Sequence, residues 1–175
     1  KMNKLSVLQN VNTVFAHPYP HICIDEALPQ SIYDELDATF PEELICSTTP
    51  HDGGVCYRYK AKECAQEAPP AIWQDFFAYH TSPEYFQECA KVFEPHIVEV
   101  YGDEFMHNML TKDVSVRDVD TGGHYVTDCQ FVVHEPVDSS GTSRTPHVDN
   151  PVEIYAGLLY MRPRTDNSTG GNFTI

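Results

Sequence analysis

The triplet His147-Val148-Asp149 is the part of this chain whose residue types and spacing could do chemistry. On a β-strand, residues i and i+2 point to the same face about 7 Å apart, so the imidazole and the carboxylate of this triplet can converge on one ion. A neutral imidazole and a hard carboxylate provide two of the three ligands in the 2-His-1-carboxylate arrangement that holds non-haem Fe(II). An isolated His-x-Asp triplet is common in proteins, so the surrounding residues decide how it is interpreted.

The residues on both sides of the triplet have the pattern of strands joined by turns. A loop rich in Gly, Ser and Thr precedes it, and Asn150-Pro151 follows it as an expected turn, because Asn accepts unusual backbone angles and Pro fixes φ. The run from Val152 to Met161 has the β-branched and aromatic content of a buried strand. A polar break then leads to Gly170-Gly171 and the start of a new strand.

This order of an HVD triplet, a long strand, a polar loop, a Gly-Gly pair and a new strand resembles the iron site of the 2-oxoglutarate/Fe(II)-dependent dioxygenases. It is most similar to the prolyl-4-hydroxylase-like branch, and phage-encoded members share the likeness. The resemblance covers roughly residues 130–175, about a quarter of the chain. A strand-then-helix entry near residues 21–40 is also similar to the way many of these enzymes begin.

The resemblance implies an α+β fold with a double-stranded β-helix core of the jelly-roll or cupin-like type, supported by N-terminal helices. It also implies an Fe(II)- and 2-oxoglutarate-dependent dioxygenase that hydroxylates an unactivated C–H bond and releases succinate and CO2. In that case His147 and Asp149 are the catalytic metal ligands, and ascorbate is a candidate reductant. The alternative interpretations are a cupin-like metal-binding protein of other activity and a catalytically silent binding module that retains part of the metal site.

Three further residues are assigned to cosubstrate binding by the same resemblance. Tyr160 lies near the end of the strand after the triplet, where prolyl-hydroxylase-like enzymes place a Tyr that hydrogen-bonds 2-oxoglutarate. Leu158 has the same strand parity, and Phe173 follows the Gly-Gly pair, so both could line the pocket. For Tyr160, a core or surface aromatic is an equally good interpretation, and His134 is open between a core histidine and a pocket residue.

The strand pattern predicts that the barrel is incomplete at the C-terminal end of this chain. A jelly roll has eight strands, whereas about four or five core strands can be placed here. The dioxygenase pattern also calls for a second His downstream of the triplet and an Arg or Lys after it, and no such pair occurs by Ile175. We therefore expect a single domain over 1–175 whose distal ligands lie outside these residues.

The chain divides into a helical part, 1–110, and a β-rich part, 111–175. A short strand is expected over His21–Leu28, followed by a helix from Pro29 to Phe40. Further helices follow Pro69-Pro70 and Ser82-Pro83, the latter running to about residue 101 with a bend at Pro95. Residues 114–119 and 130–134 alternate like strands. The aromatic residues of the helical part, Trp73 among them, are expected to form the core.

Composition limits the partners of this protein. The chain has 26 acidic and 11 basic residues and a formal net charge of −15, which argues against nucleic acid or a polyanionic membrane surface. A small-molecule, peptide or protein substrate is compatible with this charge, and the oligomeric state is left open. The 6 cysteines lack CxxC spacing, which favours free thiols and a cytoplasmic location. No run is long and apolar enough for a membrane span.

Overall fold

The computed structural model describes residues 3–51, 56–135 and 150–161, together with residues 165, 167 and 169. Within these ranges the chain forms helices in its first two thirds and most of its strands after them. The elements in chain order are α1 (Gln30–Ala38), α2 (Glu42–Cys46), β1 (Cys56–Lys60), α3 (Ala61–Gln66), α4 (Ala71–His80), α5 (Pro83–Val92), α6 (Glu94–Tyr101), α7 (Asp103–Thr111), β2 (Val114–Val116), β3 (Tyr125–Thr127) and β4 (Gln130–His134).

Helix α1 lies between the two prolines that its sequence predicts as its limits, and helix α5 begins where its sequence predicts. Helix α1 starts after Pro29 and ends before Pro41, and it buries Leu36 completely. Helix α5 begins at Pro83, and the Ser82 hydroxyl accepts a hydrogen bond from the Tyr85 N–H at 3.2 Å. A side-chain oxygen at this position satisfies an N–H that has no partner within the helix, so the expected cap is confirmed.

The expected bent helix from Ser82 to residue 101 is instead two helices, α5 and α6. Phe93 separates them: its N–H donates to the Cys89 carbonyl at 3.2 Å, while its own carbonyl accepts from Ile97 at 2.9 Å. Pro95 lies in the first turn of α6, where its missing N–H costs nothing. In the middle of one continuous helix the same proline would remove a hydrogen bond and clash with the preceding turn, so the chain breaks there.

The described strands form two small sheets. Strands β1 and β4 pair antiparallel, with Cys56 opposite His134, and β2 and β3 pair parallel, with Val114 opposite Tyr125. Only residues 128–129 separate β3 from β4, so one stretch of chain belongs first to one sheet and then to the other. A double-stranded β-helix is not evident among these strands, and the predicted barrel stays a prediction.

Two strand predictions differ from the structure. The strand expected over His21–Leu28 is reduced to one antiparallel bridge between Phe15 and His21, with N–H···O distances of 2.8 and 2.9 Å. The strand expected over 114–119 ends at Val116, whose N–H donates to the Asp120 carboxylate and whose carbonyl accepts from the Asp120 N–H at 3.1 Å. An Asp side chain that bonds nearby backbone competes with strand pairing in this way.

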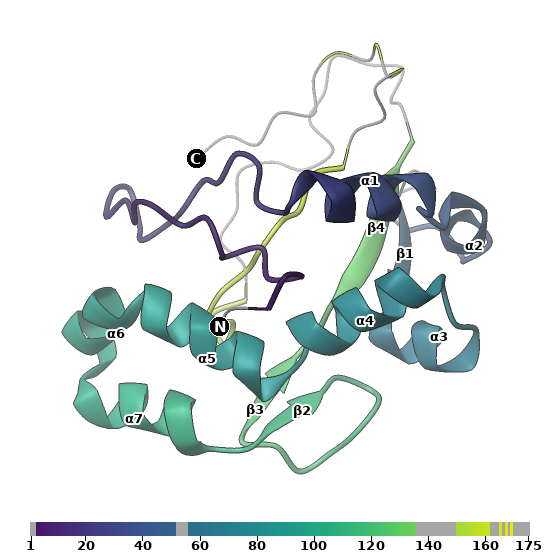
Figure 1. Ribbon diagram of the computed structural model, residues 1–175. Helices are drawn as coiled ribbons and strands as arrows, with labels where there is room; N and C mark the ends of the chain where they lie inside the picture. Colours follow the sequence, from purple (N-terminus) through teal and green to yellow (C-terminus); the bar gives the residue numbers. More distant parts are fainter. Residues whose placement is uncertain are drawn as a thin grey trace.

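The largest buried cluster lies between the helices and the β1–β4 sheet, where α1 and α4 cross the strands in Figure 1. The Trp73 ring lies 4.8 Å from the Phe131 ring and its indole N–H donates to the Leu36 carbonyl at 3.2 Å. A second cluster joins α5, α6 and α7, and includes Phe86, Ile97 and Met109. The expectation that Trp73 and its aromatic neighbours are core residues is confirmed.

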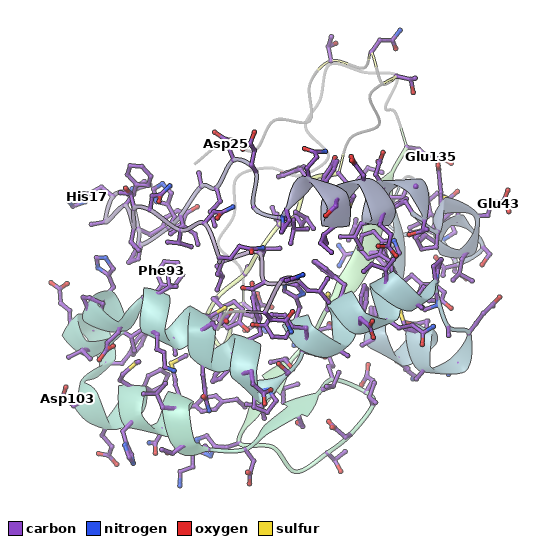
Figure 2. The ribbon with its side chains drawn as sticks, in the orientation of Figure 1. His17, Asp25, Glu43, Phe93, Asp103 and Glu135 are labelled. Atoms are coloured by element: carbon purple, nitrogen blue, oxygen red, sulfur yellow. The ribbon has the colours of Figure 1, made fainter. Side chains whose placement is uncertain are left out.

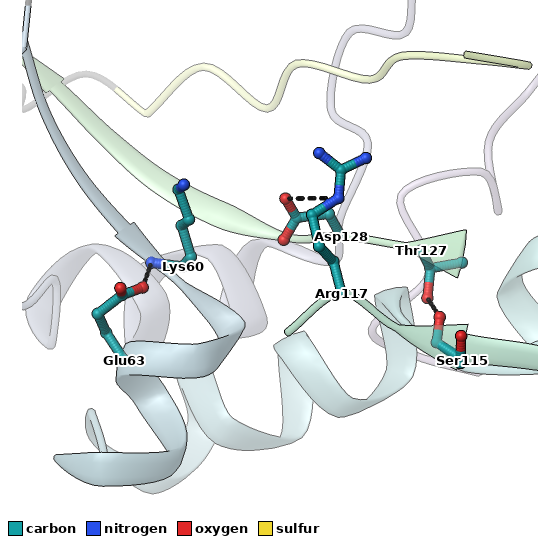
Figure 3. Close-up of polar contacts among 6 residues, drawn as sticks. All are labelled: Lys60, Glu63, Ser115, Arg117, Thr127 and Asp128. Carbon is teal, nitrogen blue, oxygen red and sulfur yellow. Dashed lines mark hydrogen bonds and ion pairs between the residues drawn. The ribbon is translucent and has the colours of Figure 1, made fainter. Parts of the chain in front are cut away.

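Polar contacts connect the junction between β3 and β4 to the neighbouring segments of the chain (Figure 3). The Thr127 hydroxyl donates to the Ser115 carbonyl at 3.3 Å and to the Thr81 carbonyl at 2.8 Å, which ties the parallel sheet to the end of α4. Arg117 and Asp128 form an ion pair with a 4.0 Å separation. Because this ion pair is partly exposed, we expect the buried Thr127 hydrogen bonds to contribute more than the ion pair to the stability of this junction.

Candidate functional site

The candidate metal ligands His147 and Asp149, and the pocket residue Phe173, lie outside the residues that the structure describes. The described chain stops at Glu135 on one side of the triplet and resumes at Asn150 on the other. The site is therefore defined here by the segment that follows the triplet and by the side chains against which that segment packs.

The chain turns immediately after the HVD triplet, as its sequence predicts. The Glu153 N–H donates to the Asn150 backbone carbonyl at 2.8 Å, and the Val152 N–H donates to the Asn150 side-chain oxygen at 3.2 Å. Pro151 occupies the second position of this four-residue turn, where its fixed φ is favourable. The turn sets the direction of the chain at the start of the described segment 150–161.

After the turn, residues 150–161 run beside β4 without joining either described sheet (Figures 1 and 3). The predicted buried strand over Val152–Met161 is therefore not among the described strands. Leu158 and Tyr160 are 66% and 62% exposed, so the structure does not place them in an enclosed pocket. The apolar content of this run predicts a buried strand. Strand β4 pairs with β1 only among the described strands, and residues 150–161 do not pair with its other edge. An apolar run becomes a buried strand only where a neighbouring strand pairs with it and another layer covers it.

Tyr155 is the residue that anchors this segment to α5. Its ring lies 6.0 Å from the Phe86 ring, and its hydroxyl and that of Tyr85 are hydrogen-bond partners of the Cys89 sulfur. Burial raises the pKa of both phenols, and it raises the pKa of the Cys89 thiol to about 12. All three groups are uncharged at neutral pH, so this contact is a packed, neutral network rather than a reactive thiolate.

His80, at the end of α4, extends this network into the core. Its ring stacks on Phe76 at 3.9 Å and lies 4.4 Å from the Tyr85 ring. Its Nδ1 lies 2.8 Å from the Phe76 carbonyl and therefore carries the proton, while its buried Nε2 has no hydrogen-bond partner among the described residues. Burial lowers the pKa of His80 to about 4, so the imidazole is neutral at pH 7.

Sequence reasoning missed His80, Cys89 and Tyr155 as a group. His80 ends an aromatic helix and Cys89 lies within the next one, and neither has a partner at a spacing typical of a motif. Tyr155 belongs to the run taken for a strand. The signal that could have found them is helical spacing, because Tyr85 and Cys89 are four residues apart and share one helix face.

His134 is an exposed residue of β4 and not a core histidine. Its Nε2 lies 3.9 Å from the sulfur of Cys56, the residue directly opposite it on β1. Cys56 is completely buried, so this side of the pair provides no accessible thiol. The two residues form a cross-strand contact at the end of the sheet that leads toward the triplet in sequence.

No group of three or more His, Cys, Asp or Glu side chains in the described ranges could hold a metal ion. All 6 cysteines are free thiols, as the sequence predicts. None of the helices in the described ranges combines the length and the apolar content needed to cross a lipid bilayer.

Comparisons with known protein families, with curated proteins and with solved structures give no match to this chain.

Proposed function

We propose that this protein is an Fe(II)- and 2-oxoglutarate-dependent dioxygenase of the prolyl-hydroxylase-like type. The observation that carries the proposal is the HVD triplet in its setting: a turn directly after Asp149, an extended apolar run and a Gly-Gly pair. The hydrogen-bonded turn at Asn150 supports this reading, because it is the element that the pattern requires next to the ligands.

In this proposal His147 and Asp149 hold the metal, as one imidazole and one hard carboxylate suit Fe(II). Bound Fe(II) with 2-oxoglutarate and O2 supplies the oxidant for an unactivated C–H bond, with succinate and CO2 as products. In this proposal Tyr160, Leu158 and Phe173 line the cosubstrate pocket. Leu158 and Tyr160 are exposed in the described chain, and Phe173 follows the Gly-Gly pair in sequence. The resemblance also calls for a second His as a metal ligand and for a basic residue that pairs with the far carboxylate of 2-oxoglutarate.

The substrate in this proposal is a small molecule or a peptide, and not a nucleic acid, because a net charge of −15 repels phosphates. The free cysteines favour action in the cytoplasm, where thiols stay reduced. The fold class does not select among prolyl peptides, free amino acids and small metabolites, since specificity depends on the pocket.

Binding of the two cofactors tests the proposal without knowledge of the substrate. The full-length protein, with any residues encoded after Ile175, is titrated anaerobically with Fe(II) and 2-oxoglutarate, and the visible absorption of the chelate is recorded. We expect a band in the wild type and in Val152→Ala, whose side chain is 80% exposed, and none in His147→Ala or Asp149→Ala.

Three other results would redirect the proposal. An unchanged band in either ligand variant would contradict the assignment of that residue. Metal binding without any effect of 2-oxoglutarate would favour a cupin-like protein of other activity. A wild-type protein that binds neither cofactor would favour the silent binding module.

A further inference from the structure

A shallow groove lies where the connection between α1 and α2 meets the connection between α3 and α4, and we call it the acidic groove. Its volume is about 770 Å³. The floor is apolar and is formed mainly by Phe40, Leu44 and Pro69; Pro69 is buried and the other two are half-buried. A volume of this size is in the range of sites that accept one or two large side chains.

The floor of the acidic groove is fixed by the main core. The Phe40 ring makes edge contacts with Trp73 and Phe131, each at 5.8 Å between ring centroids. On the other wall, the Tyr59 hydroxyl donates to the Glu67 carbonyl at 2.8 Å and holds the end of α3 in place. A groove that exists before its ligand arrives avoids the entropy cost of ordering its walls on binding.

The rim of the acidic groove carries negative charge only. Glu42 and Glu43 lie on one side and Glu67 on the other, and no Lys, Arg or His is among the lining residues. Figure 2 shows Glu43 at the outer edge of α2. No hydrogen bond or ion pair in the described ranges uses these three carboxylates. Carboxylates on both sides of an apolar floor attract a ligand that places cations on both sides of an apolar group.

We propose that the acidic groove binds a peptide segment of a partner protein in which an aliphatic or aromatic side chain is flanked by Lys or Arg. The apolar side chain covers Phe40 and Leu44, and the flanking cations pair with the rim carboxylates. The groove is argued from described residues that have no part in the proposed iron site, so its occupation does not depend on that proposal. Binding is weak and falls as salt rises, because the rim is exposed to solvent.

The test uses a defined probe, the capped peptide Lys-Leu-Leu-Lys, with capped Glu-Leu-Leu-Glu and Lys-Gly-Gly-Lys as controls. Binding is followed by the methyl NMR shift of Leu44 and by the fluorescence of Trp73, the single Trp of the chain, which contacts Phe40. We expect only the first peptide to move both signals. Absence of a Leu44 shift at about 10 mM of this peptide, or equal shifts with the acidic peptide, would overturn the proposal.

A pair of matched variants separates the groove from the general charge of the protein. Glu42→Gln/Glu67→Gln removes two rim charges, whereas Glu99→Gln/Glu104→Gln removes two exposed charges from α6 and α7. We expect the first double variant to weaken the peptide about fivefold and the second to leave it unchanged. Equal weakening by both would show that the peptide responds to net charge alone, which contradicts a specific groove.

Discussion

At the scale of single residues, the most unusual group in the described chain is the imidazole of His80. It is only 8% exposed, its Nε2 lacks a partner among the described residues, and its pKa falls to about 4 because burial opposes the charged form. The ring stays neutral between Phe76 and Tyr85, although the Phe76 carbonyl and the Glu88 carboxylate oppose part of the fall in its pKa. A buried group of this kind links the stability of the fold to pH.

We predict that this histidine makes the protein less stable in mild acid. An unfolded His titrates near pH 6.5, whereas folded His80 titrates near pH 4, so between these values the unfolded chain binds a proton that the folded chain does not. Its contribution is present above pH 6.5 and is lost as the pH falls toward 4, by about 3 kcal/mol in total. Urea unfolding of the wild type and of His80→Phe at several pH values measures this difference.

The matched control is His107→Gln, an exposed histidine on α7. Because other groups, such as Asp128 with its raised pKa, titrate equally in all three proteins, only the difference between curves is interpreted. We expect His107→Gln to follow the wild type and His80→Phe to be less dependent on pH between 4 and 6.5. Parallel curves for wild type and His80→Phe would mean that His80 does not carry the linkage.

At the scale of elements, the parallel pairing of β2 and β3 depends on Gly123. A Cβ atom at this position would overlap the Ser115 backbone nitrogen and would lie 2.7 Å from the Tyr125 carbonyl oxygen. Both of those atoms are backbone, so they cannot move aside by rotating a side chain. The loop that joins the two strands is consequently closed to any residue larger than glycine at this point.

Gly123→Ala is therefore expected to destabilise the fold by about 1–3 kcal/mol, the usual cost of overpacking. Gly157→Ala is the control, because a Cβ there would have no atom within 4 Å. Thermal unfolding of both variants gives the comparison. If Gly123→Ala melted with the wild type, the close approach to Ser115 and Tyr125 would not exist in solution.

Strand β4 offers a second test through its alternating burial. Phe131 is 4% exposed and contacts Trp73, Phe77 and Phe40, whereas its neighbour Val132 is 39% exposed. We expect Phe131→Ala to cost about 3–5 kcal/mol and Val132→Ala a small fraction of that. Chemical denaturation measures both values. Equal losses would contradict the orientation of β4, because a shift by one residue exchanges the two faces.

The elements that could be predicted from sequence are those with a local cause. The helix start at Pro29, the cap at Ser82 and the turn at Asn150 each depend on a ring or side chain that acts on nearby backbone, and all three occur as expected. The strands at 21–28 and 152–161 were predicted from alternation or apolar content, which cannot identify a pairing partner. Which strand a segment pairs with depends on residues far away in the chain, and a local sequence pattern does not contain this information.

At the scale of the whole molecule, a helical layer and the β1–β4 sheet enclose the main core, and the segment after the HVD triplet runs along this sheet (Figure 1). The contacts among His80, Cys89 and Tyr155 depend on how the helices pack, so no sequence motif predicts them. The metal ligands are proposed from residue type, from spacing and from the resemblance to a known family, none of which needs a tertiary contact. The proposed iron chemistry is therefore argued from the sequence of the triplet, whereas the contacts of the segment that follows it are taken from the structure.

Succinate formation from 2-oxoglutarate by the full-length protein, with Fe(II) and O2, tests the central proposal most directly. We expect the wild type to release succinate, even slowly in the absence of its substrate, and His147→Ala and Asp149→Ala to release none. Far-ultraviolet circular dichroism of each variant verifies that it is folded. Undiminished succinate release by either folded variant would contradict the account.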